Sequence, residues 1–237
     1  KGDRTDIELP AVQRELIDAL HRAGKKIILV NCSGSPVGLE PETQKCEAVL
    51  QAWYPGQQGG TAVAEVLFGD YNPAGKLPVT FYRNVSQLPD FEDYNMTGRT
   101  YRYMQDVPLF PFGYGLSYTT FGYGKTVLDK NELTAGQSLK LTVPVTNTGK
   151  RNGEEVVQVY LRKQGDAEGP IKTLRAFKRV SIPAGKTVNV EFDLKDKELE
   201  WWDDQSNTVR VCPGNYDIMV GGSSKEEDLQ RTTIAIK

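Results

Sequence analysis

The chain has 237 residues, of which 38% are hydrophobic and 25% are charged, and its formal net charge is −2. This composition excludes a disordered chain, and the weakly acidic balance argues against a nucleic-acid binder, which carries a basic surface. No apolar run approaches the roughly 20 residues that a membrane span needs.

The first third of the chain has an α/β pattern. Residues 10–24 are predicted to form a helix, because Pro10 suits a first turn and apolar residues recur at spacings of three and four. Residues 27–30 form a continuous apolar run, which is typical of a buried parallel strand. A second apolar run follows Cys46, and a second helix is expected after Gly59 and Gly60. A turn and a short strand are expected over residues 71–81.

The pattern changes after Phe121. Apolar residues then alternate with polar ones in short runs about ten residues apart, with Gly, Pro and Asn turns between them. This spacing is typical of an immunoglobulin-like or fibronectin type III-like β-sandwich. The predicted fold class is therefore α/β, a partial α/β sandwich, followed by an all-β sandwich.

The segment 98–121 separates these parts and is rich in aromatic residues, glycine and proline. Proline and glycine favour an irregular path, and aromatic side chains bury a large area at a partly wet boundary. We therefore expect an α/β domain over residues 1–97, an interdomain segment over 98–121 that holds the domains together, and a sandwich over 122–237.

Metal-binding and redox motifs are absent from the sequence. The three cysteines form no CxxC pair and His21 is the only histidine, so neither a metal site nor a cofactor is expected. Cys32 and Cys46 could pair in an oxidising compartment, but buried free thiols are the favoured interpretation.

Three short motifs have possible functional meanings that we weigh against structural ones. Ser33 follows a strand but lacks the G-x-S-x-G spacing of a nucleophile elbow, so a tight turn is favoured. Gly113-Tyr114-Gly115 lacks the third glycine and the context of a dinucleotide site. Trp201-Trp202 and Asp203-Asp204 could form a sugar-stacking platform, but a core tryptophan beside a solvated turn is favoured.

Two longer stretches resemble glycoside hydrolase family 3. Residues 53–81, WYPGQQGGTAVAEVLFGDYNPAGKLPVTF, are similar to a signature of that family, and residues 100–121 resemble its segment leading into a fibronectin type III-like domain. Stretches at 170–192 and 213–224 resemble strands of that last domain. The resemblance covers essentially the whole chain and is closest to the bacterial xylosidase-like branch.

The resemblance implies a retaining, exo-acting β-glycosidase with a barrel, an α/β sandwich and often the fibronectin-like domain. Such enzymes use two carboxylates about 5–5.5 Å apart, one as nucleophile and one as acid/base. In this family the nucleophile is a barrel aspartate, and the acid/base is a glutamate in an S-x-E-G-E loop shortly before an Asp-Arg pair.

Asp3 and Arg4 match that pair, and only Lys1 and Gly2 precede them. No S-x-E-G-E motif occurs, and neither Glu8, Glu15 nor Glu40 replaces it. We therefore expect no catalytic residue in this chain, which looks cut at its start. Asp3 and Arg4 are expected to shape the rim of the sugar site, or to form a structural salt bridge.

Several expectations about partners follow from the resemblance. The chain alone should lack glycosidase activity, and its α/β part should associate with the missing barrel and first half of the sandwich, with another copy or with a cleaved partner chain. The substrate would be a β-linked xyloside or glucoside, and the location periplasmic or extracellular in a bacterium. The alternatives are a non-catalytic carbohydrate-binding module and a scaffold that promotes dimerisation.

Overall fold

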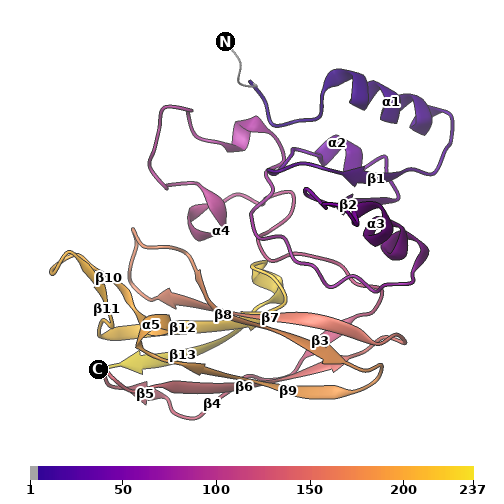
Figure 1. The fold of residues 1–237 in the computed structure, drawn as a ribbon. Helices are drawn as coiled ribbons and strands as arrows, with labels where there is room; N and C mark the ends of the chain where they lie inside the picture. The colour runs from indigo at the N-terminus through magenta and orange to yellow at the C-terminus, as the bar shows by residue number, and fades with distance from the viewer. Residues whose placement is uncertain (1–4) are drawn as a thin grey trace. The chain divides into compact units, whose positions relative to one another are not determined.

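A computed structural model describes residues 5–237, which divide into two compact units (Figure 1). Unit 1 is formed by the chain as far as Tyr71, by Val79–Arg99 and by Gln105–Pro111. Unit 2 is formed by Asn72–Pro78, Thr100–Met104 and Phe112–Lys237. The boundary expected at residue 97 falls within this interleaved stretch of sequence, whereas the boundary expected at residue 121 lies inside unit 2.

Unit 1 is the α/β part of the chain. Its sheet pairs two parallel strands, with Ile28 opposite Ala48 and Asn31 opposite Gln51. The helices and the parallel strand predicted at the start of the chain are confirmed, but the burial expected of that strand is wrong, because Ile28 is 51% exposed. The elements of unit 1 are α1 (Ala11–Arg22), β1 (Ile28–Asn31), α2 (Glu40–Thr43), β2 (Ala48–Gln51), α3 (Gly59–Phe68) and the 3-10 helix η1 (Val85–Gln87).

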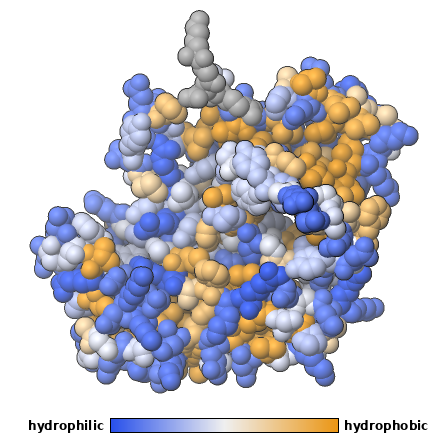
Figure 2. All heavy atoms as spheres, in the orientation of Figure 1, coloured by the Kyte–Doolittle hydropathy of each residue, from blue (hydrophilic) through white to orange (hydrophobic). Residues whose placement is uncertain are grey.

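The apolar face of α1 is largely exposed in unit 1. Val12, Leu16 and Leu20 are 71%, 61% and 38% exposed, whereas Ile17 is buried. Figure 2 shows hydrophobic residues gathered at the surface of this unit. The amphipathic spacing therefore predicted the helix correctly, while most of its apolar stripe is not covered by the described residues.

The prediction of a short strand within residues 71–81 is wrong. The structure has a single bridge there, in which Phe81 pairs with Phe110. Pro73 and Pro78 have no backbone N–H to donate, which prevents a continuous ladder.

Unit 2 is a β-sandwich whose layers are visible in Figure 1. Within residues 5–237, one sheet has the order β5-β13-β12-β7-β8, and β3, β4 and β9 each pair with β6 in another. The elements of unit 2 are α4 (Thr100–Tyr103), β3 (Phe121–Tyr123), β4 (Val127–Leu128), β5 (Glu132–Leu133), β6 (Leu139–Asn147), β7 (Gly153–Lys163), β8 (Thr173–Ile182), β9 (Thr187–Leu194), α5 (Asp196–Leu199), β10 (Trp201–Asp203), β11 (Thr208–Arg210), β12 (Gly214–Gly221), the 3-10 helix η2 (Glu226–Asp228) and β13 (Gln230–Ile236).

Strand β6 shows how the sequence determines the core of the sandwich. Its side chains alternate, so that Leu139, Leu141, Val143 and Val145 are all at most 1% exposed. A strand places alternate side chains on opposite faces, and the apolar ones pack against the facing sheet. These residues belong to one continuous apolar core.

Strand β7 is instead buried on both faces from Val157 to Leu161. Its second face lies under the segments of unit 2 that precede the sandwich in sequence. The ring of Tyr101 lies 5.8 Å from that of Tyr160 and 4.3 Å from that of Phe112, on which it stacks. Across the described residues, no helix is long and apolar enough to cross a membrane.

We predict that Leu141→Ala destabilises the chain by about 2–5 kcal/mol, because it removes buried methyl groups and leaves a cavity. Leu116→Ala is the matched control, since Leu116 is 72% exposed and its truncation should change little. Urea unfolding followed by circular dichroism measures both values. Equal free energies of unfolding for the two variants would contradict the described core.

Candidate functional site

The carboxyl ends of β1 and β2 meet at one edge of unit 1, where ligands of parallel sheets commonly bind. The side-chain amide of Asn31, at the end of β1, donates to Gln51 Oε1 at 2.6 Å and to Ser33 Oγ at 3.0 Å. Gln51 Nε2 also approaches Ser33 Oγ at 3.2 Å. These amides fix the turn that leaves β1.

Ser33 is therefore a turn residue rather than a nucleophile. Its hydroxyl donates to the backbone oxygen of Ser35 at 2.8 Å. A catalytic serine needs a base at that position. His21 lies in the last turn of α1 and is exposed, and no hydrogen bond joins it to Ser33 among the described residues.

Strained backbone lies at the same edge of the sheet. Trp53, two residues after β2, has φ of 55°. This left-handed conformation is uncommon for a bulky residue and costs on the order of 1–3 kcal/mol, and such strain is often found at functional sites. The indole packs edge-on against Phe81, with the ring centroids 6.1 Å apart.

Arg14 links the segment before α1 to this edge of the sheet through two ion pairs. Arg14 of α1 forms an ion pair with Glu8, and its Nε lies 3.3 Å from Oε1 of Glu42 in α2. Glu42 is only 1% exposed, and its oxygens have no hydrogen-bond partner among the described residues, so Arg14 supplies its compensating charge. Glu8 also forms a parallel bridge with Gly38. The sequence analysis did not identify Arg14 and Glu42, because no local motif links α1 with α2.

The acids considered in the sequence have structural partners or are exposed. Glu8 pairs with Arg14, Glu40 pairs with Arg83, and Glu15 is exposed on α1. Asp3 and Arg4 lie outside the described residues.

The three cysteines are free thiols in the structure. Cys212 is buried, whereas Cys32 is exposed, so the burial expected of the Cys32 thiol is wrong. Burial raises the pKa of Cys46, and the charge of Glu42 adds to that rise. Within the described part of the chain, no group of three or more His, Cys, Asp or Glu side chains could hold a metal ion.

The tryptophan pair has two different environments in unit 2. Trp201 is 3% exposed and belongs to the core, whereas Trp202 is 49% exposed on the hairpin of β10 and β11. Trp202 Nε1 donates to Asp204 at 2.8 Å. Hydrogen bonds from Ser206 and Arg210 hold the pKa of Asp203 at about 2. The expected core position is thus confirmed for Trp201 only.

The dinucleotide-like glycines have a packing role. Gly113 has φ of 77°, and a Cβ there would lie 2.0 Å from Oε1 of Gln158 in β7. Tyr114 follows in an irregular stretch without a helix. The motif is therefore a close approach of backbone to sheet, as glycine permits.

Comparison with known proteins identifies both parts of the chain. The glycosyl hydrolase family 3 C-terminal domain matches residues 1–118, and a fibronectin type III-like domain matches residues 155–224. The chain belongs to glycoside hydrolase family 3. The resemblance found in the sequence and the fold class expected from it are confirmed.

Similar family 3 proteins are considerably longer than this chain. A xylan 1,4-beta-xylosidase of Xylanibacter ruminicola is 57% identical over 99% of this chain and 27% of its own length. A periplasmic beta-glucosidase of Salmonella typhimurium is 39% identical over 94% of this chain and 31% of its own length. The solved structure of a b-glucosidase from Erythrobacter marinus matches with a TM-score of 0.87 at 41% identity, covering 100% of this chain and 31% of that one.

We predict that Arg14→Ala lowers the free energy of unfolding by about 1–3 kcal/mol, because it leaves Glu42 buried without a compensating charge. Glu42→Gln in the Arg14→Ala background should recover part of this loss. Arg22→Ala is the control, because Arg22 is exposed on the same helix. Denaturant unfolding measures all four chains, and an equal loss in both single arginine variants would contradict the pairing.

Proposed function

We propose that this chain is the C-terminal part of a retaining, exo-acting β-glycosidase that releases terminal xylose or glucose from β-linked oligosaccharides. The chain spans 27% of the length of the Xylanibacter relative, so the activity belongs to a longer protein in this proposal. The similarity to xylosidases and to a glucosidase supports a β-xyloside or β-glucoside substrate.

The main structural support for this proposal is that the N-terminal segment is attached to the sheet of unit 1. The Glu8–Gly38 bridge and the contacts of Arg14 hold this segment beside the carboxyl edge of the sheet. In the family, the acid/base loop precedes the Asp-Arg pair that Asp3 and Arg4 match. Unit 1 would thus provide a fixed base for that loop, and Arg14 would be a positioning residue.

We propose further that the chain alone is not catalytic. A retaining mechanism needs two carboxylates placed together, and the sequence contains neither the barrel nor an S-x-E-G-E motif. Glu8, Glu40 and Glu42 already compensate arginine charges. The exposed apolar residues of α1 support association of unit 1 with the first half of the α/β sandwich.

The location proposed for the longer protein is periplasmic or extracellular, in a bacterium. Its substrate class supports this, since oligosaccharides of plant cell walls occur outside the cell. The similarity to a periplasmic beta-glucosidase of Salmonella also supports it.

A carbohydrate-binding module is the second candidate function. The exposed indole of Trp202, beside Asp204, favours it over a scaffold, because a tryptophan face can stack on a sugar ring. In this alternative, the chain would be retained on xylan through Trp202.

We predict no hydrolysis of 4-nitrophenyl β-xyloside or β-glucoside by the purified 237-residue chain above the rate in buffer. The longer protein should hydrolyse the xyloside with the higher kcat/KM. Normal specific activity of the isolated chain would overturn the proposal. Retention on xylan that is lost in Trp202→Ala, combined with an inactive longer protein, would favour the binding module.

We also propose that Asp3 and Arg4 contact the hydroxyl groups of the substrate. In the longer protein, Arg4→Ala should then raise KM about tenfold, corresponding to the loss of roughly 1.4 kcal/mol of binding. Arg22→Ala serves as the control. A lowered thermal stability with unchanged KM would show instead that the pair forms a structural salt bridge.

A further inference from the structure

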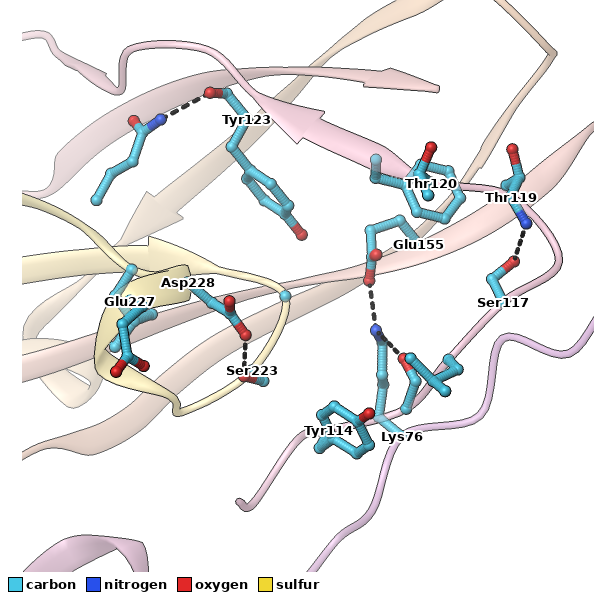
Figure 3. Close-up of a pocket in the computed structure, with 16 residues that line it drawn as sticks. Lys76, Tyr114, Ser117, Thr119, Thr120, Tyr123, Glu155, Ser223, Glu227 and Asp228 are labelled. Atoms are coloured by element: carbon cyan, nitrogen blue, oxygen red, sulfur yellow. Dashed lines mark hydrogen bonds and ion pairs between the residues drawn. The ribbon is translucent and has the colours of Figure 1, made fainter. Parts of the chain in front are cut away.

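Unit 2 contains a cavity of about 600 Å³ beside the start of β7. Its walls come from Lys76, from residues 114–123, from Glu155 and from the connection between β12 and β13. Figure 3 shows this cavity with the side chains that border it. Its volume lies within the range of small-molecule sites, which is roughly 300–1,000 Å³.

A buried carboxylate and a buried hydroxyl face each other across this cavity. Glu155 is 5% exposed, and the hydroxyl oxygen of Tyr123 is buried without a hydrogen-bond partner among the described residues. In Figure 3 this hydroxyl points into the space that Glu155 and Asp228 border. Burying a hydroxyl without a partner is costly, so this oxygen is a candidate ligand contact.

Gly222 leaves room between these two groups. A Cβ at this position would lie 3.2 Å from Oη of Tyr123 and 3.6 Å from Oε2 of Glu155. Oε1 of Glu155 pairs with Lys76 and accepts a hydrogen bond from the amide of Val156. Oε2 makes neither of these contacts and borders, together with Oε1 at 3.7 Å, the space that a side chain at residue 222 would occupy.

The charges of the wall favour a neutral ligand. Lys76 Nζ lies 3.0 Å from Glu155 Oε1 and donates to the backbone oxygen of Gly115 at 3.1 Å, so its charge is compensated. Glu227 and Asp228 are exposed acids, which would repel an anion. No group of three or more His, Cys, Asp or Glu side chains that could hold a metal ion occurs among residues 5–237.

The remaining chemistry matches a sugar ring. Tyr114 and Phe121 line the cavity and provide apolar surface, whereas Tyr123, Glu155 and Asp228 provide hydrogen-bonding atoms at its wall. A pyranose has apolar C–H groups together with hydroxyls that donate and accept. We propose that this cavity binds a neutral mono- or disaccharide. This inference does not depend on the proposed glycosidase activity.

The test is a titration of the isotope-labelled 237-residue chain, followed by its amide NMR spectrum. The probes are xylose, xylobiose and glucose, with inorganic phosphate as the anion. We expect saturable shifts for at least one sugar at the amides of residues 114–123 and 222–230. Gly222→Ala should abolish them, because its methyl group occupies the space, and Tyr123→Phe should weaken the Kd about tenfold.

Matched controls separate this site from general effects. Gly60→Ala adds a methyl group in open space on α3, and Tyr54→Phe removes an exposed hydroxyl, so both should retain wild-type binding. If Gly222→Ala changes core amides and does not fold, Tyr123→Phe decides the question. The absence of saturable sugar shifts, binding of phosphate alone, or unchanged sugar binding in Tyr123→Phe would each overturn the proposal.

Discussion

The buried amide of Gln158 is the interaction on which the second face of β7 depends. Its Nε2 donates to the backbone oxygens of Gly113 and Gly222, at 3.1 Å and 2.7 Å, and its Oε1 accepts from the hydroxyl of Tyr160. One side chain thus satisfies backbone groups from two distant segments inside the protein, where unpaired polar groups are costly. This explains how an irregular segment can cover a sheet without forming strands of its own.

The same arrangement determines the shape of the cavity. Gly113 permits the close approach of the backbone to Gln158, and Gly222 has its carbonyl held by Gln158 while its missing side chain leaves space beside Tyr123 and Glu155. Burial raises the pKa of Glu155, and Lys76 opposes that rise. Packing of the segment and formation of a polar cavity therefore have one physical origin.

Unit 1 depends on polar contacts more than on a large apolar core, because its sheet is small. A pair of parallel strands buries little by itself, and much of α1 remains apolar and exposed. Order at the carboxyl edge comes instead from polar contacts, namely the amides of Asn31 and Gln51 and the charges around Arg14. Such directional contacts hold turns in place, which suits an edge that would position a neighbouring loop.

The sequence by itself determined the α/β part, the sandwich and the family, because hydrophobic periodicity and ordered motifs are local properties of the chain. It also predicted the core alternation of Leu139–Val145, since a strand has a period of two. Only the tertiary structure showed that Trp201 is buried while Trp202 is exposed, that Arg14 meets Glu42, and that Tyr123 faces Glu155. Arg14 and Glu42, like Tyr123 and Glu155, are far apart in sequence and meet only when the backbone folds. Trp201 and Trp202 are adjacent and differ only in the face of the strand on which each side chain lies, which only the fold decides.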